Sequence, residues 1–171
     1  RVVGHALDDG LRNPAVEGSR YERLIKKAGG IDLMLLGIGH NGHIGFNEPS
    51  SSLGSRTRVK TLTPDTIKAN RRTFTGLNPL PETAITMGIG TILESKRIIL
   101  MGTGPHKAAA IAAAVEGPLT AQVPASSLQL HPSVTIVLDR AAAARLKQRR
   151  YYQWVHQHQQ TLERQYGAPN R

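Results

Sequence analysis

Short apolar runs that alternate with helical stretches constrain the fold of this chain more than any other feature. Four runs are strand-like: "IDLMLLG" (31–37), "TAITMG" (83–88), "RIILMG" (97–102) and "SVTIVLD" (133–139). Helix signals precede the first run, in the stretch that starts at Pro14 and ends near Ala28, and lie between the third and fourth runs, in "PHKAAAIAAAVEG" (105–117). This alternation predicts an α/β fold with an open, mostly parallel sheet, helices on both faces and strands buried on both sides. In such sheets functional residues collect at the carboxyl ends of the strands.

The composition narrows the class of protein. The chain has 171 residues, about one domain, which we divide into a body over 1–147 and a basic helix or tail over 148–171. It contains no cysteine, so disulfides and thiolate metal sites are excluded, and no metal or cofactor is implied. No run approaches the roughly 20 apolar residues of a membrane helix. We therefore expect a cytoplasmic protein with no membrane contact.

The charge favours anionic partners. Lys and Arg number 22 against 12 Asp and Glu, a formal net charge of +10. Seven of the basic residues follow Asp139, where Glu163 is the only acid. We interpret this tail as a solvated helix face. Nucleic-acid binding through Tyr151, Tyr152 and Trp154 is the less favoured alternative.

The loop "GIGHNGHIGFNEP" (37–49), directly after the first strand, concentrates the reactive side chains. Its glycines formally fit a dinucleotide loop with Asp65 as the ribose acid, but that motif needs a helix after the third glycine, and Gly45 and Pro49 disfavour one. His40 and His43 could bind a metal, but no third ligand is indicated.

A third interpretation uses His43 as an acid-base group. An imidazole can take up and return a proton near neutral pH, and Glu48 could fold back to orient it. The glycines around it, Gly39 among them, would let a ligand approach the backbone closely. At the next strand end, "GTGPHK" offers Lys107 and a helical turn for an anion. The alternating cations of "SRTRVKT" (55–61) would suit phosphate or form a solvated edge.

These motifs together resemble a known family. "LGIGHNGHIGFNEPSSSLGSRTRVKTL", "TMGIGTIL", "GTGPHKAAAIAAAVEG" and "SSLQLHP" are similar to the glucosamine-6-phosphate deaminases, collinearly from about Ile31 to Asp139. The resemblance implies conversion of glucosamine 6-phosphate and water to fructose 6-phosphate and ammonia. The related 6-phosphogluconolactonases share the fold and a Gly-His loop but are not expected to continue with Phe-Asn-Glu-Pro.

The resemblance also implies roles for individual residues. His43 would be the acid-base residue of sugar ring opening, with Glu48 orienting it and Asn41 standing where many members carry an aspartate. Arg72 and Lys107, with Gly39, would bind the substrate. A further set matches residues that bind the activator N-acetylglucosamine 6-phosphate in hexameric members: Ser51, Arg58, Lys60 and Thr61.

One part of the family pattern is not found in the chain. The chain begins at Arg1. The family's phosphate loop and enolising aspartate belong to a first part that we expect upstream of this residue. Without that part we expect an exposed edge or face of the sheet and no isomerisation. Competing functions are a non-catalytic phosphosugar-binding module or inactive fragment, a 6-phosphogluconolactonase-type hydrolase, and nucleic-acid binding.

Overall fold

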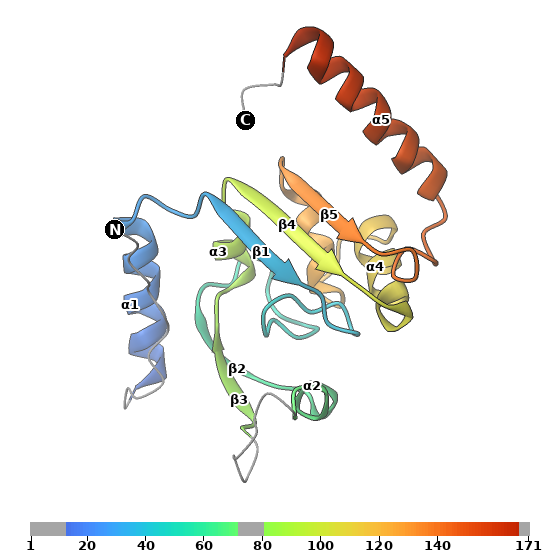
Figure 1. Cartoon of the computed structure of the whole chain (residues 1–171). Coiled ribbons are helices and arrows are strands. Elements are labelled where there is room, and N and C mark those ends of the chain that lie inside the picture. Colours follow the sequence, from blue (N-terminus) through green and yellow to red (C-terminus); the bar gives the residue numbers. More distant parts are fainter. Residues whose placement is uncertain (1–12, 72–80, 168–171) are drawn as a thin grey trace.

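A parallel sheet of three strands organises the molecule. The computed structural model describes residues 13–71 and 81–167. The sheet has the order β1 (Leu33–Gly37), β4 (Arg97–Gly102), β5 (Val134–Leu138), and both strand pairs are parallel (Figure 1). The α/β fold with a parallel sheet that the sequence predicts is thereby confirmed, and the β4 bounds agree with the predicted run.

One face of this sheet packs on helices and forms the core. Met34, Leu36, Ile98 and Leu100 lie on that face because side chains alternate along a strand and the parallel register aligns them. They pack against α3 (Ile89–Leu93), α4 (Ala108–Glu116) and η2 (Pro124–Leu130). Ala110, Ile111 and Ala114 of α4 belong to this core, and the helix is preceded by η1 (Pro105–Lys107).

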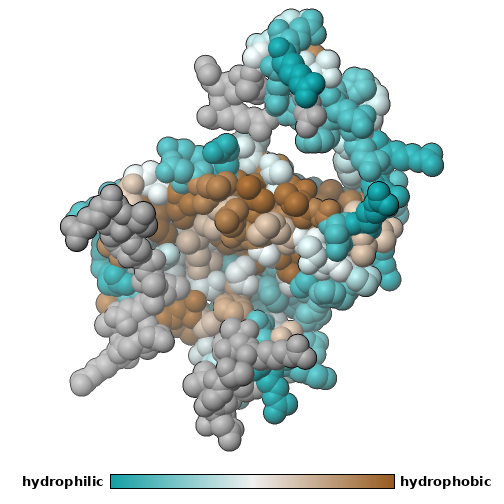
Figure 2. All heavy atoms as spheres, in the orientation of Figure 1, coloured by the Kyte–Doolittle hydropathy of each residue, from teal (hydrophilic) through white to brown (hydrophobic). Residues whose placement is uncertain are grey.

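The opposite face of the sheet is apolar but uncovered by the described residues. Leu35 is 59% exposed, Met101 48% and Val137 51%, and Figure 2 shows apolar surface across the strands on this side. The prediction that these strands are buried on both sides was therefore wrong. The exposed face that we expected from the family comparison is present, because in the described part of the chain the packed helices lie on the other side.

A small second sheet carries the segment after the reactive loop. Strand β2 (Arg58–Thr61) pairs antiparallel with β3 (Thr83–Thr86), and α1 (Pro14–Lys27) contacts both strands. Helix α1 begins as predicted with Pro14 after the capping side chain of Asn13, and Gly29 and Gly30, both at positive φ, follow shortly after its end at Lys27. Helix α2 (Pro64–Ala69) follows β2 and is capped by Thr63.

The C-terminal part forms one long helix after a series of turns. The stretch 140–146 is built of turns, and α5 (Arg149–Tyr166) then extends away from the sheet (Figure 1). Trp154 stacks on His158 along the exposed surface of α5. Within the described ranges no helix combines the length and apolarity needed to cross a bilayer. The division at residue 147 and the cytoplasmic location stay predictions.

Candidate functional site

The loop after β1 holds His43 at the carboxyl end of the sheet. The Gly39 N–H donates to the His43 carbonyl at 2.8 Å, and the Gly42 N–H donates to the Gly39 carbonyl at 3.1 Å. Gly42 has φ of 83°, which favours glycine. No helix follows Gly42, and Asp65 lies in the first turn of α2, so the geometry needed for a dinucleotide loop is not formed here.

A chain of side chains joins His43 to Glu48 through Asn41. His43 Nδ1 lies 2.7 Å from Asn41 Oδ1, and Asn41 Nδ2 donates to Glu48 Oε2 at 2.8 Å. Because the Asn41 amide donates through Nδ2, its Oδ1 must accept, so Nδ1 of the imidazole carries the proton. The neutral ring then has its lone pair on Nε2. The structure thus brings the three predicted catalytic residues together and gives Asn41 the central position.

The contact between His43 and Glu48 is longer than the two links through Asn41. His43 Nδ1 is 3.4 Å from Glu48 Oε2, an ion-pair distance, but Asn41 makes the short hydrogen bonds to both partners. Orientation of the ring therefore comes from Asn41, while Glu48 supplies the charge. An asparagine can hold the ring by a hydrogen bond but contributes no charge, so the negative charge of the site comes from Glu48.

Glu48 remains ionised although its side chain is almost fully buried. The residue is 2% exposed, and burial alone would raise the pKa of its carboxyl. Hydrogen bonds from Thr66, Asn41 and the backbone of Thr63 outweigh that effect and place the pKa below its ordinary value. The site therefore contains a fixed negative charge beside the imidazole.

Burial lowers the pKa of His43, and its neighbours act in both directions. Glu48 raises this pKa, while the nearby His40 and Lys107 lower it, and the net shift is downward. The neutral imidazole is thus the main form near pH 7, which is the form that accepts a proton. His40 itself lies at the rim, with Nε2 3.9 Å from Asp65 Oδ2.

Gly39 makes room for the His43 ring. A Cβ at this position would lie 2.2 Å from His43 Cε1, 2.3 Å from Nδ1 and 2.5 Å from Nε2. Any side chain at residue 39 would therefore displace the imidazole. The structure gives Gly39 this packing role, while substrate contact at Gly39 stays a prediction.

The predicted substrate ligands are only partly within the described residues. Lys107 is half-buried in η1, and its ammonium is close enough to His43 to oppose protonation of the ring. Burial also lowers the pKa of Lys107. The N–H of Gly104, at the same turn, donates to Asp139 Oδ2 at 2.8 Å, so that donor is already used. Arg72 lies outside the described residues.

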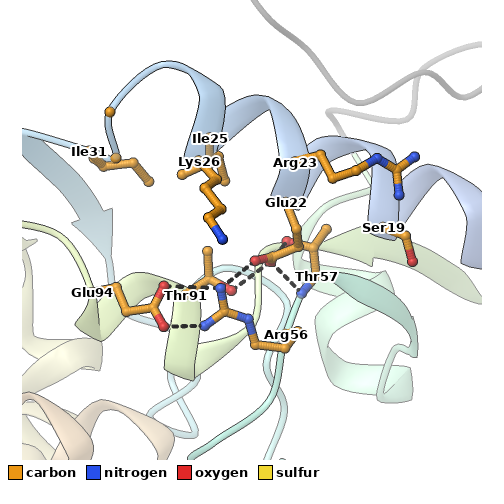
Figure 3. A pocket seen from close by; sticks show the side chains of 12 residues that line it. Ser19, Glu22, Arg23, Ile25, Lys26, Ile31, Arg56, Thr57, Thr91 and Glu94 are labelled. Atoms are coloured by element: carbon orange, nitrogen blue, oxygen red, sulfur yellow. Dashed lines mark hydrogen bonds and ion pairs between the residues drawn. The ribbon is translucent and has the colours of Figure 1, made fainter.

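The cations of "SRTRVKT" do not act as one set. Arg58 and Lys60 lie on one face of β2, as predicted for a strand, and Arg58 donates to Asn47 Oδ1 at 2.9 Å. Arg56 lies before the strand and binds Glu94 and Glu22 instead (Figure 3). Its guanidinium is engaged in these ion pairs, so it is not a free phosphate ligand.

The other two residues of the predicted activator set differ in exposure. Ser51 is 2% exposed, and its hydroxyl is buried without a hydrogen-bond partner among the described residues. Thr61 is exposed at the end of β2. Binding of an activator by the set stays a prediction.

Three surface cavities lie elsewhere in the described part of the chain. One of about 870 Å³ is lined by α1 together with Arg56, Thr91 and Glu94 (Figure 3), one of about 440 Å³ lies beside α2, and one of about 960 Å³ lies between α5 and β5. None of these three is lined by His43, Glu48 or Lys107. Among the described residues no group of three or more His, Cys, Asp or Glu side chains is placed to hold a metal ion. The candidate site is therefore defined by the polar chain around His43.

Sequence reasoning missed the two threonines that bind Glu48. Thr63 donates to Glu48 Oε1 through its N–H at 3.3 Å and its hydroxyl at 3.2 Å, and Thr66 contributes another hydrogen bond. The pattern Thr63-Pro64 does signal a helix start. That signal gives no indication that the cap also meets a carboxylate 15 residues earlier.

Comparison with known proteins shows the family of the chain. The family model described as glucosamine-6-phosphate isomerases/6-phosphogluconolactonase matches residues 3–137. The chain belongs to this family. Two curated relatives of the chain are glucosamine-6-phosphate deaminases. The protein of Hahella chejuensis is 53% identical over 87% of this chain, and that of Marinomonas sp. is 55% identical over 89%. The chain spans 57% and 56% of their lengths.

Solved structures of family members show the same fold. A monomeric glucosamine-6-phosphate deaminase superposes with a TM-score of 0.78 at 47% identity, over 81% of this chain and 58% of the other. The 6-phosphogluconolactonase from Trypanosoma cruzi superposes with a TM-score of 0.60 at 22% identity, over 85% of this chain and 55% of its own. At that identity the second match speaks for the shared α/β fold alone.

Proposed function

We propose that this chain provides the acid-base centre of a glucosamine-6-phosphate deaminase, which converts glucosamine 6-phosphate and water to fructose 6-phosphate and ammonia. The observation that carries the proposal is the chain His43–Asn41–Glu48 at a strand end, next to Lys107. More than half of the residues in the aligned regions are identical to those of curated deaminases. The likeness to a lactonase supports only the fold.

His43 would open the sugar ring. Its neutral Nε2 takes the proton of the hydroxyl on C1 and returns a proton to the ring oxygen, so that the bond between C1 and that oxygen breaks and an aldehyde forms. The imidazolium that exists between the two transfers is stabilised by the buried charge of Glu48, 3.4 Å from Nδ1. Asn41 keeps the ring from turning during the exchange, because it binds Nδ1 at 2.7 Å.

Lys107 would hold the phosphate of the substrate. A half-buried ammonium is a suitable partner for a phosphate dianion, since the two charges meet where water is partly excluded. Arg72 is proposed as the second phosphate ligand from its place in the family pattern. The subsequent proton transfer from C2 to C1, which completes the isomerisation, is assigned to an aspartate of the family's first part, which is not among the residues of this chain.

Activation and assembly are separate parts of the proposal. Binding of N-acetylglucosamine 6-phosphate rests on the resemblance around Ser51, Arg58, Lys60 and Thr61. A related deaminase at 47% identity is described as monomeric, so a hexamer does not follow from family membership. Light scattering and the dependence of the rate on added N-acetylglucosamine 6-phosphate read the two properties independently.

The decisive experiment uses the full-length protein and the variant His43→Gln. Ammonia release from glucosamine 6-phosphate should fall by at least about 100-fold, because glutamine cannot exchange the proton. His158→Gln, on the exposed surface of α5, is the matched control and should retain full activity. Ammonia release that is absent from the unmodified protein would reject the deaminase proposal in favour of a phosphosugar-binding module, and full activity of His43→Gln would remove His43 from the catalytic role.

A further inference from the structure

The Glu48 carboxylate has two differently occupied oxygens. Oε2 faces the catalytic side, where it accepts from Asn41 and lies near His43. Oε1 faces away, toward the start of α2, and accepts from the N–H and the hydroxyl of Thr63. The position of the charge beside the imidazole is therefore set by the hydrogen bonds of Thr63 to Oε1 as well as by the hydrogen bond of Asn41 to Oε2.

The two threonines form one polar unit. Thr63 Oγ1 accepts from the Thr66 N–H at 3.3 Å and lies 3.0 Å from Thr66 Oγ1. Thr66 also hydrogen-bonds Glu48 and is fully buried. Each hydroxyl has a single proton, so the pair supplies two, and the geometry directs them to each other and to Oε1. A buried threonine cannot exchange these partners for water without opening the structure.

We infer that Thr63 and Thr66 are positioning residues that hold the Glu48 carboxylate where it can act on His43 through Asn41. The expected effect on catalysis rests on the proposed function, whereas the placement of the Glu48 carboxylate by the threonines rests on the hydrogen-bond geometry. The side-chain contacts of both threonines lead to Glu48 and to each other, so we expect both to act through Glu48.

Loss of the donors would change the site in a defined direction. A carboxylate that is 2% exposed and loses hydrogen bonds becomes easier to protonate or turns away. Either change weakens the interaction with Asn41 and removes negative charge from His43. The other charged groups that act on the His43 ring are His40 and Lys107, and both disfavour its protonation. The pKa of His43 should therefore fall further once Glu48 no longer opposes them.

The test compares Thr66→Val with Thr66→Ser in the full-length protein. Valine keeps the size of threonine but has no hydroxyl, so kcat for ammonia release should fall about tenfold with little change in KM. Serine keeps the hydroxyl and should restore kcat. NMR titration of the His43 Cε1 proton, assigned by its absence in His43→Gln, should show a lower pKa in Thr66→Val than in the unmodified protein.

A second buried threonine provides the control. Thr91 donates its hydroxyl to Glu22 Oε1 at 2.6 Å, a contact that involves neither His43 nor Glu48, and is 1% exposed. Thr91→Val should lose stability while leaving the His43 titration and kcat unchanged. If Thr66→Val behaves as this control does, the two threonines have only a structural role and the inference is wrong.

The inference can fail separately from the proposed function. If the protein releases no ammonia, the deaminase proposal fails, but the His43 titration in Thr66→Val still decides whether Glu48 is held by the threonines. If Thr66→Val does not fold, Thr66→Ala, which removes the hydroxyl without adding an apolar methyl in its place, gives the same comparison. An unchanged His43 titration in a folded hydroxyl-free variant overturns the inference.

Discussion

Replacing Gly39 by alanine should damage catalysis with little effect on folding. The new Cβ would lie 2.2 Å from His43 Cε1, whereas non-bonded carbon atoms are most stable at about 3.5 Å or more. The ring must therefore move by roughly 1 Å, because the backbone of the loop is held by hydrogen bonds and the imidazole is the part that can give. A displacement of that size in a catalytic group can cost about 100-fold in rate, or about 2.7 kcal/mol of transition-state stabilisation.

The assay is ammonia release from glucosamine 6-phosphate, reported as kcat/KM, together with thermal unfolding. Gly37→Ala is the matched control, because a Cβ at the end of β1 meets nothing within 4 Å. The stability of both variants should change by no more than about 1 kcal/mol, since alanine also restricts the unfolded chain. Equal kcat/KM for Gly39→Ala and Gly37→Ala would show that the position of the His43 ring is not what Gly39 provides, and the reasoning would be refuted.

Three further outcomes are expected. Burial lowers the pKa of His43, and only the neutral ring accepts a proton, so kcat/KM should decline on the acid side at a pH below the ordinary histidine value of 6.5. A decline centred above that value would contradict the geometry. Arg56→Ala should reduce the free energy of urea unfolding by about 1 kcal/mol, because Arg56 joins the carboxylates of Glu22 and Glu94. Lys96→Ala, which breaks an exposed pair with Asp32, should cause no measurable change. Equal effects of the two substitutions would count against a stabilising role of the Arg56 ion pairs. Leu35→Lys in the 171-residue chain should reduce the fluorescence of bound anilinonaphthalene sulfonate, because it places charge in the exposed apolar sheet face, and unchanged fluorescence would locate the dye elsewhere.

The strands and helix ends were predictable because their signals are local. The run "RIILMG" agrees with β4 over all its residues, and Pro14 and Gly29 bound α1 as expected. The burial of the strands was not predictable in the same way. An apolar run such as 33–37 indicates that both sides could be covered, but only the arrangement of helices decides that one side of this sheet is covered here.

The residues of the candidate site show the same difference between what was predictable and what was not. The spacing of His43 and Glu48 and the family motif named the residues correctly as one cluster. The position of Asn41 between them depends on the loop conformation, which brings the Asn41 side chain within hydrogen-bond distance of both His43 and Glu48. The spacing of charges in 55–61 left phosphate binding and a solvated edge as alternatives, and it did not indicate that Arg56 pairs with carboxylates of α1 and of the end of α3.

The sequence by itself determined the class of fold and the family and singled out His43 as the candidate acid-base residue, because strand and helix periodicity and a dense loop motif are written in neighbouring positions. Only the tertiary structure decided which hydrogen bonds set the charge and orientation of that residue. Thr63 and Glu48 are 15 positions apart, and their contact exists because β2 returns the chain past the loop before α2 begins. Electrostatic effects of this kind depend on distance in space and on exclusion of water, and neither quantity can be derived from the order of residues.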